Sequence, residues 1–212
     1  MEPSTESFLS PYRFLDLTDD RGFLCGKILS SLGAEVIKIE PPGGDASRLS
    51  GPSVQTKPAS EPENGLFWFA YNQGKRGITL NLQSLEGQAL FRRLVANANG
   101  IIESFSPGYL DSLGLGYSAL TQANPGLILT SITPFGQDGP YKDWIAPDIV
   151  GMALSGYMYL CGDPDRAPVR ISYPQAYLHA AAEAAVGTMI ALYHWINTGE
   201  GQLVDVSMQE SL

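Results

Sequence analysis

The sequence predicts an α/β fold with a Rossmann-like, mostly parallel sheet. Strand-like runs of β-branched and aromatic residues alternate along the chain with stretches that carry a helical apolar period. Residues 12–18, 21–32 and 34–40 are predicted to form a strand, a helix and a strand, which is one βαβ unit with a right-handed crossover. The chain has 212 residues, 44% of them hydrophobic, enough for one substantial core. One domain is therefore expected, with two small domains as the alternative.

Residues 21–32 are predicted to form the helix of this unit, because they carry one apolar face: Leu24, Ile28 and Leu32, with Cys25 and Leu29 beside them. Asp19 or Asp20 is expected to cap the free N–H groups at the start of this helix. Gly33 is expected to end it, since glycine takes the left-handed conformation of a helix C-terminus at little cost.

The later elements continue this alternation. Residues 41–64 are rich in Pro, Gly and Ser and lack an apolar period, so they predict a long loop of a kind that is often functional. Ser84 begins a predicted helix over 84–98 with part of a capping box, and Pro174 suits the first turn of a helix over 174–195. The remaining strands are expected at 77–82, 100–104, 127–133 and 203–208, and the remaining helices near 117–122 and over 149–160.

Charge and cysteine content narrow the class of protein. The chain has 13 Lys and Arg against 22 Asp and Glu, a net charge of −9. Its adjacent basic pairs, at 75–76 and 92–93, form no stripe, which argues against binding to nucleic acid. Cys25 and Cys161 lie far apart and have neither metal-binding spacing nor a disulfide framework. This usage fits a reducing, cytoplasmic location, and no metal site is expected.

Two features speak against a secreted or membrane protein. The N-terminus has no basic region followed by an apolar run, so no signal peptide is expected. His179, Glu183 and His194 interrupt the apolar helix 174–195, which is therefore not expected to span a membrane.

His179 and Glu183 are four residues apart on this helix and could form a general acid–base pair or a structural hydrogen-bonded pair.

Other polar residues have a functional and a structural interpretation. The run from Gly22 resembles a phosphate loop, but it is one residue short and has Ile28 where Ser or Thr would bind Mg²⁺. The dinucleotide fingerprint is absent after the first strand. Arg21 lies where a helix N-terminus meets the sheet edge, so it is either a phosphate contact or a solvated charge. Asp148 and Glu103 are carboxylates of interest, although the end of a strand, as at Glu103, is more often solvated.

Seven sequence blocks, in order, resemble the family III CoA-transferases, the carnitine dehydratase and bile-acid-inducible protein F group. Together they cover nearly the whole chain. The blocks are residues 15–18 (LDLT), 32–48 (LGAEVIKIEPPGGDASR), 72–82 (NQGKRGITLNL), 106–120 (SPGYLDSLGLGYSAL), 124–141 (NPGLILTSITPFGQDGPY), 147–156 (PDIVGMALSG) and 198–212 (TGEGQLVDVSMQESL).

The resemblance implies a Rossmann-like large domain that binds coenzyme A and interlocks with a second subunit as a homodimer or heterodimer. Acyl-CoA and a carboxylic acid would be the substrates, with no permanently bound cofactor. Family members are about twice this long, so residues 1–212 resemble the N-terminal part of the large domain. The chain is then expected to end within the helix after VSMQ, without the small domain and the C-terminal return.

The resemblance also carries over a set of coenzyme A-binding positions. The turn after the first strand has DDRG where the family has AGP, Asn81 stands where the family has Asp, and Ser104 stands where it has Asn. The implied contacts are Arg21, Gly22, Leu80, Asn81, Leu82, Gln83, Ser104, Phe105, Ser106 and Asp148.

At the position of the family nucleophile, this chain departs from the family pattern in the way that most affects the expected mechanism. Family transferases use one aspartate, which takes the acyl group as a mixed anhydride and then holds CoA as a thioester. Counting back from TGEGQ, that place is taken by Tyr177, and a phenol cannot become the acyl side of a CoA thioester. Within residues 173–195 the only carboxylate is Glu183, six residues further on and on a different helical face.

Four interpretations follow. The chain is a nucleophile-lacking subunit of a heteromeric CoA-transferase whose partner supplies the carboxylate, or an active transferase with a relocated carboxylate, Glu183 or Asp148. A non-catalytic acyl-CoA-binding scaffold is a further alternative. An acyl-CoA racemase ranks last, since its histidine would precede Asp148, where this chain has Pro147.

Overall fold

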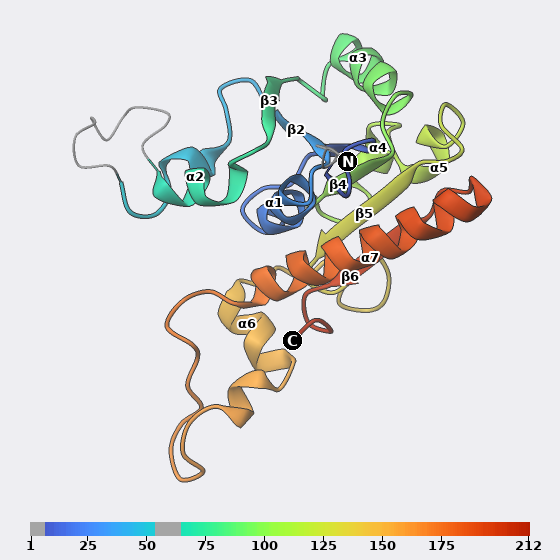
Figure 1. The fold of residues 1–212 in the computed structure, drawn as a ribbon. Coiled ribbons are helices and arrows are strands. Elements are labelled where there is room, and N and C mark those ends of the chain that lie inside the picture. Colours follow the sequence, from blue (N-terminus) through green and yellow to red (C-terminus); the bar gives the residue numbers. More distant parts are fainter. Residues whose placement is uncertain (1–6, 54–64) are drawn as a thin grey trace, which may run out of the picture.

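The computed structural model describes residues 7–53 and 65–212. Within them the chain forms a six-stranded sheet in the order β3-β2-β1-β4-β5-β6, and each neighbouring pair is parallel (Figure 1). This strand order is that of Rossmann-type folds, so the predicted fold class is confirmed, with a fully parallel sheet. The strands are β1 (Arg13–Asp16), β2 (Glu35–Glu40), β3 (Arg76–Thr79), β4 (Gly100–Glu103), β5 (Ile128–Thr133) and β6 (Leu203–Ser207).

The predicted βαβ unit is present as β1, α1 (Phe23–Ser31) and β2. α1 ends where expected, with Gly33 at a φ of +101° just beyond it. The predicted aspartate cap is wrong, because no side chain in the described structure caps this helix. Asp19 is instead hydrogen-bonded to Arg21 and Ser104. A local partner, Arg21, and a distant one, Ser104, thus bind the carboxylate that the local pattern assigned to the helix.

Two apolar layers cover the faces of the sheet. One lies under α1 and α7, and the other lies under three helices on the opposite face. β5 contributes to both, because its side chains alternate: Ile128 and Ile132 enter the first layer and Leu129 enters the second. A buried 2.7 Å hydrogen bond between the hydroxyls of Thr130 and Thr188 ties α7 to β5. The covering helices are α3 (Leu85–Val95), α4 (Tyr109–Ser112), α5 (Tyr117–Leu120) and α7 (Ala176–Thr198).

The predicted loop 41–64 contains regular structure in its described part. A short 3₁₀ helix, η1 (Ala46–Leu49), begins after Asp45, whose carboxylate accepts a hydrogen bond from the first turn. Side-chain capping stabilises this turn without any apolar period, which is why the pattern missed it. Residues 54–64 lie outside the described residues. A further helix, α2 (Leu66–Asn72), follows the loop and packs its aromatic residues against α1.

Between β5 and α7 the chain makes an excursion that projects from the sheet (Figure 1). It contains α6 (Asp148–Leu154) and η2 (Tyr157–Leu160). The prediction of one continuous helix over 149–160 is wrong, because Gly156 adopts a φ of +86° and breaks it. α7 is present as predicted, although it begins after Pro174 rather than with it.

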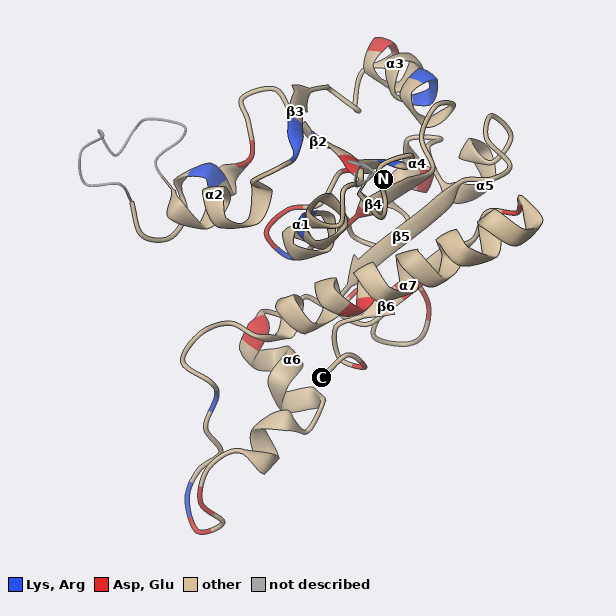
Figure 2. Ribbon diagram, viewed as in Figure 1, with Lys and Arg blue, Asp and Glu red and all other residues tan. Residues whose placement is uncertain are grey.

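Charged residues are dispersed over the fold. Figure 2 shows Lys and Arg on α1, β3, α3 and the excursion, with no basic stripe along one element. Turns rather than a helix occupy residues 208–211, after β6. Within the described residues, no helix combines the length and the apolarity that crossing a bilayer requires.

Candidate functional site

The carboxyl ends of the strands meet at one edge of the sheet, and the strand order reverses between β1 and β4. Loops diverge at such a reversal and leave the crevice in which open α/β sheets bind ligands. Here the crevice is a pocket of about 460 Å³, which we call the switch-point pocket. Its lining residues are Leu17, Thr18, Asp19, Lys38, Ile39, Glu40, Pro41, Pro42, Asp45, Leu80, Asn81, Leu82, Gln83, Ser104, Phe105 and Tyr109.

The switch-point pocket brings together residues that the sequence singled out from two separate loops. Lys38 and Tyr109, which were not singled out, line it as well. The rings of Phe105 and Tyr109 lie 4.7 Å apart between centroids, and Lys38 is the buried cation of the pocket. An aromatic surface beside a cation suits a flat heterocycle that carries anionic groups. The predicted residues found here are Leu80, Asn81, Leu82, Gln83, Ser104 and Phe105.

The buried carboxylate of Asp16 is hydrogen-bonded to the loop after β1. Its Oδ1 accepts hydrogen bonds from the N–H and the hydroxyl of Thr18, at 2.9 and 2.6 Å, and its Oδ2 lies 2.7 Å from Lys75 Nζ. Lys38 Nζ lies 3.8 Å from Oδ1 and donates to the Thr18 carbonyl. Burial alone would raise the pKa of Asp16, but the two ammonium groups and the hydrogen bonds hold it below its ordinary value. The buried cluster of Asp16, Lys38 and Lys75 therefore holds the backbone of this loop in place.

The loop after β4 is joined to the loop after β1. Asp19 N–H donates to Ser104 Oγ, and the Ser104 hydroxyl donates to Asp19 Oδ1, both at 2.9 Å. Phe105 N–H donates to Glu103 Oε2 at 2.7 Å. Glu103 is only 4% exposed, so the solvated strand end favoured by the sequence is wrong. Burial raises its pKa to about 7.

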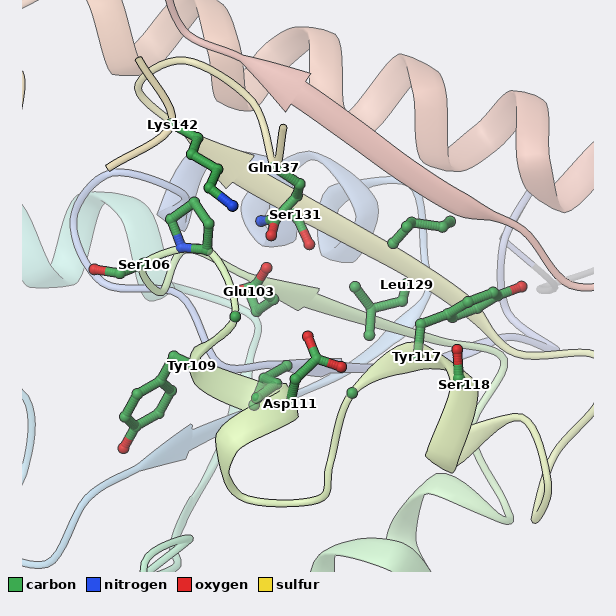
Figure 3. Close-up of a pocket in the computed structure, with 15 residues that line it drawn as sticks. Glu103, Ser106, Tyr109, Asp111, Tyr117, Ser118, Leu129, Ser131, Gln137 and Lys142 are labelled. Carbon is green, nitrogen blue, oxygen red and sulfur yellow. The ribbon is translucent and has the colours of Figure 1, made fainter. Parts of the chain in front are cut away.

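Glu103 also faces a second pocket, of about 410 Å³, beside α4 and α5 (Figure 3). Strand register places Ser131 beside Glu103 and Asp205 beside Ser131. Lys142 reaches toward the same space from the excursion after β5 (Figure 3). Ser106 lines this second pocket and not the switch-point pocket, so it lies apart from the other residues predicted in its loop.

A third pocket, of about 390 Å³, lies around Tyr177, and we call it the Tyr177 pocket. The hydroxyl of Tyr177 donates to the Ala146 carbonyl at 3.0 Å. Burial raises the pKa of this phenol, while Arg21 beside it acts in the opposite direction. The lining residues are Asp20, Arg21, Ser50, Gly51, Phe67, Pro147, Asp148, Tyr173, Pro174, Tyr177 and Leu178.

Arg21 and Gly22, both predicted as coenzyme A contacts, do not line the switch-point pocket. The Arg21 guanidinium faces the Tyr177 pocket and is bound to both carboxylate oxygens of Asp19, at 2.7–3.0 Å. Gly22 is a packing requirement, because a Cβ there would lie 2.4 Å from Thr18 Cγ2. Its role in the structure is to let α1 approach the loop closely.

Asp148 and Glu183, the predicted fallback nucleophiles, have different surroundings. Asp148 Oδ1 accepts hydrogen bonds from the N–H groups of Gln175 and Ala176, at 2.6 and 2.8 Å, so it caps the N-terminus of α7 from another segment. Glu183 is exposed on α7 and lines none of the three pockets described above. Within the described structure, no hydrogen bond or ion pair joins it to His179.

Several residues of the site escaped the sequence reasoning. The available signal was a charged residue between two apolar neighbours in a strand-like run, at Asp16 and at Lys38, since buried charges need partners. Asp20 lines the Tyr177 pocket, whereas the sequence pattern indicates only a helix cap for it. Across residues 7–53 and 65–212, no group of three or more His, Cys, Asp or Glu side chains could hold a metal ion.

Comparisons with known proteins identify the family of this chain. The model of the family described as CoA-transferase family III matches residues 12–212. The succinyl-CoA:(R)-benzylsuccinate CoA-transferase subunit BbsE of Thauera aromatica is 42% identical over 202 residues, 95% of this chain and 49% of that protein. The succinyl-CoA–D-citramalate CoA-transferase of Chloroflexus aurantiacus is 40% identical over 192 residues, 90% and 46% of the two chains.

Comparison with solved structures indicates the same family. A CAIB/BAIF family protein from Brucella suis superposes with a TM-score of 0.89 at 36% identity, over 98% of this chain and 55% of that one. The chain thus spans about half the length of the curated relatives described above. The match over nearly all of its own residues, together with the switch-point pocket, shows that the chain belongs to CoA-transferase family III.

Proposed function

We propose that this chain is a coenzyme A-binding subunit of a cytoplasmic CoA-transferase and that it lacks the nucleophilic carboxylate. It interlocks with a second, homologous chain that supplies this carboxylate, and together they move CoA from an acyl-CoA to a free carboxylic acid. The names of the relatives, one of which is a subunit of a succinyl-CoA-dependent enzyme, support succinyl-CoA as the donor. The free state of Cys25 and Cys161 is consistent with a reducing compartment.

The observation that carries this proposal is the side chain at position 177. Counting back from TGEGQ puts Tyr177 in the place of the family aspartate, and its hydroxyl donates a hydrogen bond to the Ala146 carbonyl. The predicted substitutes do not replace it: Asp148 is occupied as the cap of α7, and Glu183 lies outside the pocket. Without a carboxylate, the phenol cannot pass an acyl group on to CoA through an acyl-enzyme thioester.

Coenzyme A fits the switch-point pocket. The paired rings of Phe105 and Tyr109 offer a stacking surface for adenine. Lys38, which lines the pocket, provides positive charge for phosphate oxygens. The hydrogen bonds between Ser104 and Asp19 keep the two sides of the pocket in place before the ligand arrives.

Calorimetric titration of CoA into the chain tests the binding step. Phe105→Ala should weaken CoA binding about tenfold, because stacking of a base on an aromatic ring typically contributes that much. Phe69→Ala is the matched control, since Phe69 is 45% exposed and does not line the switch-point pocket. Equal affinities for the two variants, or no binding by the unmodified chain, would contradict the proposal.

Hydroxylamine trapping tests which of the two chains carries the nucleophilic carboxylate. The chain is incubated with succinyl-CoA alone and then together with a homologous chain that carries aspartate at the position of Tyr177. We expect the hydroxamate on that homologous chain and none on this one. Retained CoA binding without transfer in any such pair would identify a non-catalytic scaffold instead.

One observation favours a second candidate, an active transferase with its carboxylate at Asp20. Asp20 lines the Tyr177 pocket, and the adjacent Asp19 lines the switch-point pocket, so Asp20 could reach both an acyl group and the CoA sulfur. Burial and the charge of Asp19 raise its pKa. In the first step, an Asp20 oxygen would attack the thioester carbonyl, the C–S bond would break, and CoA would leave as the thiolate. This candidate predicts a hydroxamate on the isolated chain that disappears in Asp20→Asn and persists in the exposed control Asp163→Asn.

A further inference from the structure

We propose that the free edge of β3 binds an extended, acidic polypeptide segment of a partner protein as an additional strand. β3 lies at one end of the strand order and pairs only with β2 in the described part of the chain. An edge strand presents a row of unpaired N–H and C=O groups, to which a further strand can add. The inference goes beyond CoA transfer, because it assigns a partner to a strand that the proposed function does not use.

A groove of about 600 Å³ lies beside this edge, between β3 and α3. Its apolar residues are incompletely covered, since Ile78 is 37% exposed and Leu90 is 46% exposed. Ile78 points to the α3 face of the sheet, because its neighbour in the register, Ile39, belongs to the apolar layer on that face. Every second side chain of an added strand would lie on this face and could cover both residues. The lining residues are Ile78, Thr79, Leu80, Leu90, Arg93, Leu94, Ala96 and Asn97.

The charges at this edge favour an acidic occupant. Arg93 is the one charged side chain in the lining, and it forms no ion pair within the described residues. Arg13 and Arg76 share one carboxylate, that of Glu35, at 2.6 Å each, so one positive charge is left over. Arg13 Nη1 also lies 3.3 Å from the carbonyl of Asn97, which places this charge at the groove. The edge is therefore positive on a chain whose net charge is −9.

The same charges disfavour pairing with a second copy of this chain. Two β3 edges side by side would bring their arginines together, and like charges on neighbouring strands are destabilising. β6, the edge strand at the other end of the sheet, carries Asp205 and has no Lys or Arg. An acidic segment is therefore expected to add to β3 and not to β6.

The backbone of β3 offers a test that keeps its pairing with β2. Leu80 N–H donates to the Glu40 carbonyl at 2.9 Å, so the N–H of the preceding residue, Thr79, points to the free edge. Proline is tolerated in an edge strand where the N–H faces outward. Thr79→Pro should therefore block strand addition without removing a bond to β2, whereas Thr79→Val keeps the N–H and should not block it.

Fluorescence anisotropy with labelled heptapeptides measures the preference in the 212-residue chain. The probe EVEVEVE is acidic and has the strand period, KVKVKVK reverses its charge, and EPEPEPE keeps the charge but lacks every second N–H. We expect EVEVEVE to bind at least about tenfold more tightly than either counterpart at low salt, and less tightly as the salt concentration rises. Hydrogen exchange followed by NMR should show slower exchange of the Thr79 amide and no change in β6.

Variants connect this binding to the groove. Thr79→Pro and Arg93→Glu should each weaken the binding of EVEVEVE at least about tenfold, while Thr79→Val and Arg166→Glu should change it less than about twofold. Arg166 is the matched charge control, because its side chain is 75% exposed on the excursion and does not line the groove. Unfolding curves are recorded for every variant.

Three kinds of result would overturn the proposal. The first is equal binding of EVEVEVE and KVKVKVK, or binding of neither. The second is binding of EVEVEVE that survives both Thr79→Pro and Arg93→Glu, or that EPEPEPE equals, since charge alone would then explain it. The third is displacement of EVEVEVE by an oligothymidylate that binds more tightly, which would assign this edge to nucleic acid instead.

Discussion

Asp16 and Glu103 are buried carboxylates at the ends of the neighbouring strands β1 and β4, yet their environments are opposite. Asp16 has Lys75 at 2.7 Å and Lys38 at 3.8 Å, and its pKa lies below the ordinary value. Glu103 accepts a hydrogen bond from the neutral Phe105 N–H, and burial raises its pKa to about 7. A buried carboxyl group at the same sheet edge thus has a lowered pKa in one place and a raised pKa in the other.

The different environments of Asp16 and Glu103 show how the loops of this site are held in place. Both carboxylates hold the backbone of a loop that lines the switch-point pocket: Asp16 through Thr18, and Glu103 through Phe105. Removing a counter-ion should therefore damage the fold, whereas changing the pH should act on Glu103. Four variants sharpen this contrast, in order of decreasing effect.

Lys75→Met should have the largest effect. It removes the ammonium that pairs with buried Asp16, and breaking a buried ion pair from one side costs about 3–5 kcal/mol of unfolding free energy. Urea denaturation measures the loss, with Lys27→Met as the control, since Lys27 makes only a 3.4 Å exposed contact with Gln73. A loss no greater than that of the control would refute the structural role of the pair.

Glu103→Gln should change the pH dependence of stability. The raised pKa means that the stability contributed by protonated Glu103 is present below about pH 4.5 and is lost as the pH rises through about 7. The neutral amide avoids this loss, so the variant should gain on the order of 1–3 kcal/mol relative to the unmodified chain between pH 5 and 8. Unfolding curves at several pH values test this. Exposed Glu86→Gln serves as the control, and parallel profiles for Glu103→Gln and the unmodified chain would rule out the titration.

Ser104→Ala should have a moderate effect. It removes both 2.9 Å hydrogen bonds to Asp19 and leaves the Asp19 N–H without this acceptor, at a cost of about 1–2 kcal/mol. Because these bonds connect the loops after β1 and β4, the affinity for CoA should fall a few-fold as well. Ser112→Ala, which removes an exposed local hydrogen bond to Tyr109, is the control. An unchanged CoA affinity would show that the connection does not shape the pocket.

Arg76→Ala should have the smallest effect. Its guanidinium lies 2.6 Å from Glu35, but the Arg76 side chain is 75% exposed. An exposed pair of this kind contributes roughly 0–1 kcal/mol and less at high salt. Denaturation at low and high salt measures it, and a loss comparable to that of Lys75→Met would remove the distinction between buried and exposed pairs.

The secondary structure was largely predictable because its signals are local. Runs such as EVIKIE and LILTSIT, which are typical of buried parallel strands, correspond to β2 and β5. The loops after β3 and β4 were also expected to contribute to one site, and six of their residues line the switch-point pocket. Local patterns failed where a side chain had a distant partner, as for Asp19, or where a single glycine broke a helix, as at Gly156.

The sequence by itself determined the order of the strands along the chain, their parallel arrangement and the phenol at position 177, because periodicity, turn chemistry and residue identity are properties of the chain. Only the tertiary structure decided which charges are paired. Lys75 lies 59 residues from Asp16, and Asp148 caps a helix that starts 28 residues later. Such contacts depend on strand register and loop packing, and these decide whether a buried carboxylate stays ionised, titrates near neutral pH or caps a helix.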